Sequence, residues 1–145
     1  MLPQSKAVIA IIPISKTNGA TATGETIDTK GYDFVTIDVI ASTADVVSNT
    51  LSVLTLQESD TTSGFANISG LVSGTDFTIA TNAYTTTTNQ NVWKFNIDCR
   101  ARKRYLQVKA SPQTTMVIAG VANLHRGEQA PITASKANAL NLVQG

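Results

Sequence analysis

The sequence predicts an all-β fold, a β-sandwich, from three observations. The chain of 145 residues contains 21 threonines, together with many serines and asparagines. Threonine is β-branched and fits a half-exposed pleated surface, whereas serine and asparagine favour turns. Apolar and polar residues also alternate with a period of two, and turn residues interrupt these runs at short intervals. A chain of this length fits one domain with a single core.

The N-terminal part is predicted to hold one strand followed by a loop. Residues 6–15 form a dense β-branched run, and Pro13, which has no N–H, places this run at a sheet edge or close to a strand end. Residues 16–31 contain three glycines and no large apolar side chain except Ile27. This composition predicts a long loop or arm.

The remaining strands follow from the same alternation. Apolar residues recur with a period of two in five runs, residues 32–41, 49–59, 92–99, 104–110 and 114–124. Two weaker candidates lie between residues 65 and 79, separated by glycines. In residues 92–99 the alternation places Trp93, Phe95, Ile97 and Cys99 on one face, which we expect to point into the core.

The C-terminal residues differ from the rest in composition. Residues 126–145 are poor in bulky apolar side chains until Leu140, Leu142 and Val143. We therefore expect a domain at residues 1–124 and a C-terminal arm at residues 125–145, whose three late apolar residues contact a partner. Residues 1–5 are a second candidate arm.

The charge balance argues against a polyanion-binding protein. The net charge is +1, and only 14% of the residues are charged. Such a chain has no long-range field that collects nucleic acid. No apolar run approaches the roughly 20 residues that a membrane-spanning helix needs. We therefore expect neither a nucleic-acid nor a membrane partner.

One cluster of cations stands out within this nearly neutral chain. Arg100, Arg102, Lys103 and Arg104 fall within five residues, between two predicted strands. We interpret the cluster as a hairpin turn with a docking role, because arginine forms paired hydrogen bonds with carboxylates of a partner surface. Nucleic-acid binding is the alternative, but Tyr105 is the only aromatic residue immediately beside the cluster.

Catalytic and metal-binding patterns are weak, so we expect a protein that is not an enzyme and has no cofactor. Cys99 and His125 are the single thiol and the single imidazole, and nothing in their spacing brings them together. We expect Cys99 to be buried and inert. Glu58 and Asp60 form a carboxylate pair that suits a Ca²⁺ ion, but carboxylates in a turn are more often solvated. No phosphate-binding glycine motif occurs.

Three sequence segments resemble a family of small structural proteins of tailed bacteriophages and prophages. These are a "GYD" strand start at Gly31, a "QESD" strand end at Gln57 followed by Phe65, and a "KRYLQV" strand start at Lys103. The resemblance covers about residues 31–124. It implies a β-sandwich, with a jelly roll as one form, and extended N- and C-terminal segments.

The same resemblance implies a function in the virion. It indicates a capsid decoration or cement protein, made in the host cytoplasm, that binds the outside of the major capsid protein lattice as a homo-oligomer, with a trimer as the expected state. A tail-tube, head–tail joining or fibre-base protein remains an alternative. A carbohydrate-binding β-sandwich that uses Trp93 or Tyr84 as a stacking platform is a second alternative.

Overall fold

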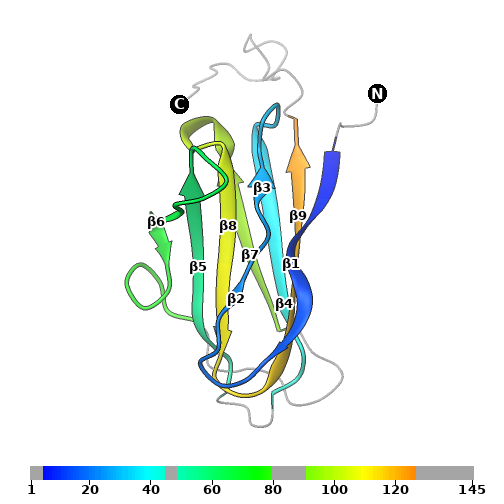
Figure 1. Ribbon diagram of the computed structural model, residues 1–145, viewed down its shortest axis with the longest axis vertical. Helices are drawn as coiled ribbons and strands as arrows, with labels where there is room; N and C mark the ends of the chain where they lie inside the picture. Colours follow the sequence, from blue (N-terminus) through cyan, green and yellow to red (C-terminus); the bar gives the residue numbers. More distant parts are fainter. Residues whose placement is uncertain (1–4, 45–48, 80–90, 127–145) are drawn as a thin grey trace, which may run out of the picture.

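The chain folds into two antiparallel β-sheets packed face to face, in a computed structural model that describes residues 5–44, 49–79 and 91–126 (Figure 1). Sheet A has the strand order β1 (Ser5–Lys16), β9 (Met116–His125), β4 (Phe34–Ala41) and β7 (Val92–Asp98). Sheet B has the order β2 (Ala22–Thr23), β8 (Tyr105–Pro112), β5 (Leu51–Ser59) and β6 (Ala66–Val72), and β3 (Ile27–Asp28) also pairs with β8. The predicted β-sandwich is confirmed.

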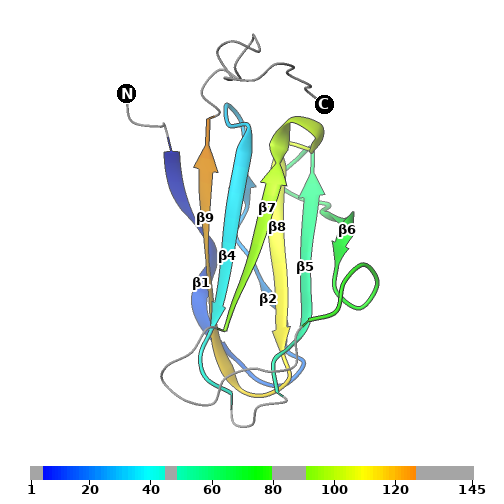
Figure 2. The ribbon, with the colours of Figure 1, turned by 180° about the vertical axis from the view of Figure 1, so that it is seen from behind.

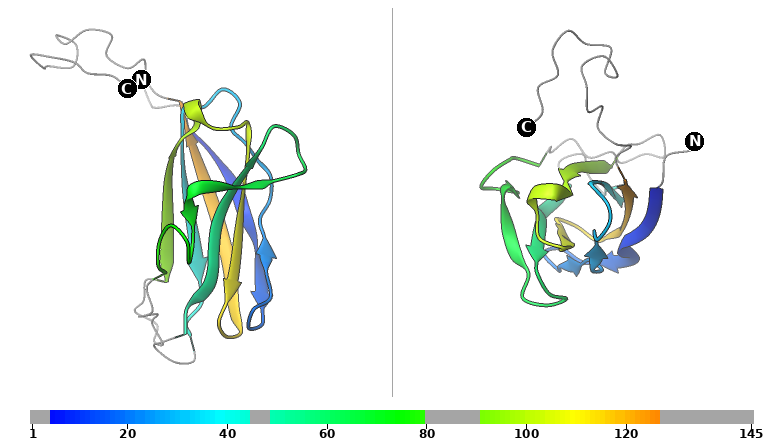
Figure 3. Two further views of the ribbon diagram at one scale, coloured as in Figure 1. Left: turned by 90° about the vertical axis from the view of Figure 1, so that its left-hand side faces the viewer. Right: turned by 90° about the horizontal axis from the view of Figure 1, so that it is seen from above.

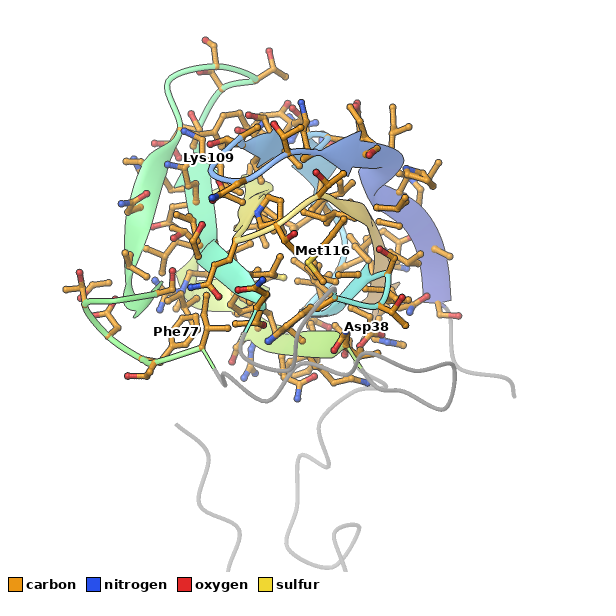
Figure 4. The ribbon with its side chains drawn as sticks, turned by 90° about the horizontal axis from the view of Figure 1, so that it is seen from below. Asp38, Phe77, Lys109 and Met116 are labelled. Carbon is orange, nitrogen blue, oxygen red and sulfur yellow. The ribbon has the colours of Figure 1, made fainter. Side chains whose placement is uncertain are left out.

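The core lies between the sheets and is built from the alternating apolar residues. Val35, Ile37 and Val39 of β4 are at most 1% exposed, as are Leu106 and Val108 of β8. Burying a side chain of this size stabilises the fold by about 1.5–3 kcal/mol. Figure 4, a view along the strands, shows Met116 inside the sandwich and Lys109 outside it.

Neighbouring strands at the C-terminal end of the fold lie in different sheets. β7 pairs with β4 in sheet A, β8 pairs with β5 in sheet B, and β9 returns to sheet A (Figure 2). The prediction of a hairpin turn at Arg100–Arg104 is therefore wrong: this segment crosses from one sheet to the other through the short 3₁₀ helix η1 (Cys99–Ala101). A period of two identifies the buried face of a strand but not the strand beside it.

The predicted loop at residues 16–31 lies against the sandwich and contains the short strands β2 and β3. Ala22 and Ile27 are at most 1% exposed. Between them, the Gly24 N–H donates to the Val108 carbonyl at 2.7 Å, and the Glu25 N–H donates to the Ala10 carbonyl at 2.8 Å. These two hydrogen bonds join β8 of sheet B to β1 of sheet A and close one side of the sandwich.

On the opposite side, the end strands β7 and β6 are bridged by side chains instead of main-chain pairing. The rings of Phe77 and Phe95 meet edge to face, with centroids 6.4 Å apart. Phe77 belongs to the loop after β6, where the second weak strand candidate forms only an isolated bridge between Ser73 and Phe77. Figure 3 shows the two sides of the sandwich, and Figure 4 labels Phe77 beside β6.

Gly24→Ala is expected to destabilise the fold by about 1–3 kcal/mol, the usual cost of overpacking. An added Cβ atom would lie 2.4 Å from the Ala10 carbonyl oxygen and 2.8 Å from the Val108 oxygen, so main chain would have to move. Urea unfolding measures the loss. The exposed neighbour Thr23→Ala serves as the control and should change the stability by less than about 0.5 kcal/mol. Equal stability of the two variants would show that Gly24 does not hold the sheets together.

Candidate protein-interaction surfaces

The predicted basic cluster lies at one end of the sandwich, where the strands of both sheets terminate. Phe34 pairs in register with Asp98 and with His125, so β4, β7 and β9 reach this end together. Asp28 and Ser59 both pair with Tyr105 there. We call this the crossover end, and residues 99–104 the crossover segment.

Arg100 is held by an aspartate at the start of the crossover segment. Its Nε and Nη2 atoms donate to the two oxygens of Asp98 at 2.9 and 2.6 Å, and its guanidinium lies 5.1 Å from the centre of the Phe34 ring. Asp98 also caps η1 by accepting from the Arg100 N–H. The hydrogen bonds from Arg100 lower the pKa of Asp98 to about 2.

Arg104 is held in the same manner on the other sheet. Its Nε and Nη2 atoms donate to both oxygens of Asp28 at 2.9 and 2.7 Å, and its guanidinium lies 4.7 Å from the centre of the Tyr105 ring. The hydrogen bond from Arg104 lowers the pKa of Asp28 to about 2. The Arg104 carbonyl accepts from the N–H and the hydroxyl of Thr29, which fixes the main chain at this point.

Lys103 engages the two carboxylates that were considered for a metal. Its N–H donates to Glu58 at 3.1 Å, and its ammonium lies 3.3 Å from Asp60. Among the residues described, no three His, Cys, Asp or Glu side chains gather closely enough to hold a metal ion. Glu58 and Asp60 thus anchor the crossover segment onto the end of β5.

Arg102 differs from the other three cations of the cluster. Within the described part of the chain, no carboxylate lies within ion-pair distance of its guanidinium. The structure therefore satisfies Arg100, Lys103 and Arg104 internally and leaves Arg102 as the cluster member available to an outside anion. The other predicted partner residues, Leu140, Leu142 and Val143, lie outside the described residues.

Cys99, the single thiol of the chain, lies at the crossover end, at the start of η1. Cys99 is buried, and its S–H lies 3.9 Å from the Ile97 carbonyl. Burial, together with the nearby carboxylates Asp98 and Asp33, raises the pKa of this thiol to about 11. A thiol with this pKa is almost entirely protonated at neutral pH, so it is a poor nucleophile. The predicted buried and inert cysteine agrees with this environment.

Thr36, Asn96 and Asn123 form a polar row across the outer face of sheet A towards the crossover end. The half of this outer face away from the crossover end is apolar, and we call that half the apolar face. Its exposed large apolar residues come from all four strands of the sheet and are Ile9, Ile12, Ile40, Val92, Val117 and Val121. Ile9 lies opposite Val121, and Ile40 lies opposite both Ala119 and Val92, so these side chains form rows across the sheet.

One ion pair interrupts the apolar face. Asp38 lies between Val121 and Lys94 in register, and its Oδ1 atom is 3.2 Å from the Lys94 ammonium. This buried oxygen receives no aligned hydrogen bond, so the contact is an ion pair held by charge alone. Figure 4 labels Asp38 on the outside of the sandwich.

The outer face of sheet B is polar by comparison. Gln107, Gln57 and Asn67 lie in one row across β8, β5 and β6, and the Gln57 amide donates to Asn67 at 2.7 Å. Val53 is the only large apolar side chain of a described sheet B strand that is prominently exposed. The two outer faces of the sandwich are therefore chemically different.

Of the two aromatic residues that the carbohydrate-binding alternative names, only Trp93 belongs to the described part of the chain. Trp93 lies opposite Val39 of β4 and packs against the core, as the alternation in residues 92–99 predicted. Tyr84 lies outside the described residues.

Sequence reasoning missed the apolar face. Its signal was present in residues 32–41, where Phe34 and Ile40 share a face with Thr36 and Asp38, but two apolar residues in one strand do not reveal a surface. The face becomes visible only when β1, β9, β4 and β7 are known to be neighbours.

No protein-family model matches the sequence, and no curated protein matches it. No helix in the described ranges is long and apolar enough to cross a membrane.

Asp28→Asn is expected to lower the stability at pH 7 by roughly 0.2–1 kcal/mol, the range for an exposed ion pair. The folded-state pKa of Asp28 is depressed, so its contribution is present above the unfolded value of 3.8 and is lost as the pH falls towards 2. Urea unfolding from pH 7 to pH 2 should therefore show the wild-type advantage shrinking below about pH 4.

Glu25→Gln is the matched control for this titration, because Glu25 is exposed and takes part in none of the ion pairs described. A difference between wild type and Asp28→Asn that stays constant over the whole pH range would contradict an ionic contribution.

Proposed function

We propose that the protein is a non-catalytic structural component of a bacteriophage virion, a capsid decoration or cement protein that binds the shell of the major capsid protein. The observation that supports this role best is the apolar face of sheet A. The specific place in a virion rests on the resemblance to phage structural proteins at Gly31, Gln57 and Lys103.

The apolar face supports a role in protein assembly. An antiparallel sheet that faces water on one side normally carries polar side chains there, as sheet B does. Sheet A instead exposes six large apolar side chains in the half of its outer face away from the crossover end. A contiguous apolar area of this kind on a soluble domain commonly marks a surface that another protein covers.

We assign the apolar face to contacts between copies of this chain. The Asp38–Lys94 pair supplies one charge of each sign within the face, so it is neutral as a unit. Another copy can cover the pair without burying a net charge. A partner surface that carries mostly one sign of charge would instead place a like charge against either Asp38 or Lys94. A closed homo-oligomer such as a trimer then hides the face of every copy.

The pairing of strands is compatible with a jelly roll, one of the architectures found in viral capsid domains. If β2 and β3 are counted as one interrupted strand, the first strand pairs with the last and the second with the last but one. The third then pairs with the sixth, and the fourth with the fifth. A long antiparallel ribbon that is rolled up produces this order.

The proposed activity requires only binding. A protein that binds the assembled shell in preference to free subunits stabilises the shell by mass action. An oligomer attaches through several equivalent sites, and this multivalency raises the overall affinity without new types of contact. At the crossover end, Arg102 is the cation best placed to meet a carboxylate of the shell.

Ile40→Asp is expected to shift the protein from oligomer to monomer, because it places a charge in the centre of the apolar face. Size-exclusion chromatography with light scattering measures the mass. Val53→Asp is the matched control: Val53 is 38% exposed on sheet B and Ile40 is 45% exposed on sheet A. An unchanged mass for Ile40→Asp, with the fold intact by circular dichroism, would exclude the apolar face as the contact between copies.

Deletion of residues 127–145 is expected to lower binding to capsid shells and the temperature at which decorated shells rupture, because we assign this segment to contacts with neighbouring subunits. The shells are assembled from the major capsid protein of the same phage genome without this protein. Unchanged occupancy and rupture temperature would remove the segment from the mechanism. If the full chain binds tail structures and not shells, the capsid role is excluded and a tail role replaces it.

A further inference from the structure

A groove of about 350 Å³ opens between the end strands of the two sheets, on the side opposite Gly24. β6 contributes Ser69 and Leu71 to its walls, and β7 contributes Asn96, Ile97 and Asp98. Arg102 of the crossover segment lines the groove at the crossover end. Figure 3 shows β6 and β7 on this side of the molecule, below η1.

Among the described residues, no strand pairs with the outer edge of β7, which we call its free edge and which lies along this groove. The hydrogen bonds from the Cys99 N–H to the Asp33 carbonyl and from the Ala41 N–H to the Asn91 carbonyl fix the phase of the β4–β7 ladder. In an antiparallel pair, alternate residues direct both main-chain groups to the neighbouring strand. The odd-numbered residues of β7 therefore bond to β4, and Asn96 and Asp98 direct their N–H and C=O groups away from it.

The edge of β6 is protected, in contrast. The N–H groups of Gly70 and Val72 both donate to the Asp76 Oδ2 atom, each at 2.9 Å. A carboxylate on two successive edge N–H groups blocks strand addition at that place. Among the described residues, no such cap lies on Asn96 and Asp98, so β7 is the wall of the groove that is open to pairing.

The charges in the groove favour an anionic ligand. Asp98 lines the groove, but Arg100 holds both of its oxygens. Arg102 has no carboxylate within ion-pair distance in the described ranges. A ligand with a carboxylate near Arg102 would gain a charge-assisted hydrogen bond, whereas a cationic ligand would meet the guanidinium unopposed.

We propose that this groove binds an extended segment of another protein, which adds to sheet A as a strand beside β7. Its main chain pairs with Asn96 and Asp98, an apolar side chain packs towards Leu71 and Ile97, and an acidic side chain reaches Arg102. Strand addition of this kind takes its affinity from main-chain hydrogen bonds and its specificity from alternate side chains. The site is separate from the apolar face and does not require the proposed virion role, although both proposals use Arg102.

Two synthetic octapeptides test the proposal with the full chain. Both alternate threonine and valine over six residues; one has an aspartate at each end and the other a lysine at each end, so that either strand direction presents the charge to Arg102. The aspartate peptide should bind and shift the amide resonances of Ser69–Leu71 and Asn96–Arg102 in NMR spectra. The lysine peptide should bind at least about tenfold more weakly.

Two variants separate the main-chain and charge contributions. Asn96→Pro removes an N–H at the free edge without breaking a bond to β4, so peptide binding should be lost. Asn96→Ala keeps this N–H and is the matched control, so it should retain binding. Arg102→Gln should make the affinities for the two peptides equal, and it tests the site even if the proline variant fails to fold.

Three results would overturn the proposal. If the aspartate peptide does not bind at a peptide concentration of about 1 mM, the affinity of the groove is too low to support an assembly. Equal affinity of the wild-type chain for both peptides would remove the role of Arg102. Shifts of the same amides on raising the protein concentration without peptide would identify a second copy of this chain, and not a different acidic segment, as the occupant.

Discussion

The unequal closure of the two sides of the sandwich is the constraint on which the other features depend. On one side, main-chain hydrogen bonds of Gly24 and Glu25 join β8 to β1 and leave no space for a side chain at position 24. On the other side, Phe77 of the loop after β6 contacts Phe95 of β7. Main-chain bonding fixes the separation of the sheets, whereas an edge-to-face ring contact covers only part of an edge. The groove and the free edge of β7 exist because closure is incomplete there.

The sequence predicts the faces of strands well and their neighbours poorly. In residues 92–99, alternation alone placed Trp93 and Phe95 inward, and the structure agrees. The same alternation carries no information on strand partners, so it predicts a hairpin at Arg100–Arg104, where the chain in fact crosses between the sheets. Ion pairs show the same limit, because Asp28 and Arg104 are 76 residues apart and meet only after β3 pairs with β8. The sequence predicts a loop at residues 16–31 because β2 and β3 are each two residues long, too short for a periodic signal.

The distribution of charge explains how a chain with few charged residues presents a distinct end. Arg100, Lys103 and Arg104 each have a carboxylate within the chain, and so the crossover end is dense in charge yet nearly neutral. A neutral, dense array attracts partners weakly at long range and orients them at short range. The apolar face supplies the opposite property, a large favourable free energy of burial with little directionality.

Pairing within the chain also prepares the crossover end for binding. Each of the two held arginines has its guanidinium fixed by hydrogen bonds from two of its nitrogen atoms to an aspartate and by an adjacent aromatic ring. Long side chains that are ordered before binding lose less conformational entropy when a partner arrives. Arg102, which lacks such an anchor among the described residues, bears the full entropic cost of being ordered. An anion in the neighbouring groove must therefore bind Arg102 more strongly than an anion that meets Arg100 or Arg104. The groove consequently favours a ligand whose carboxylate is already held in place on an extended strand.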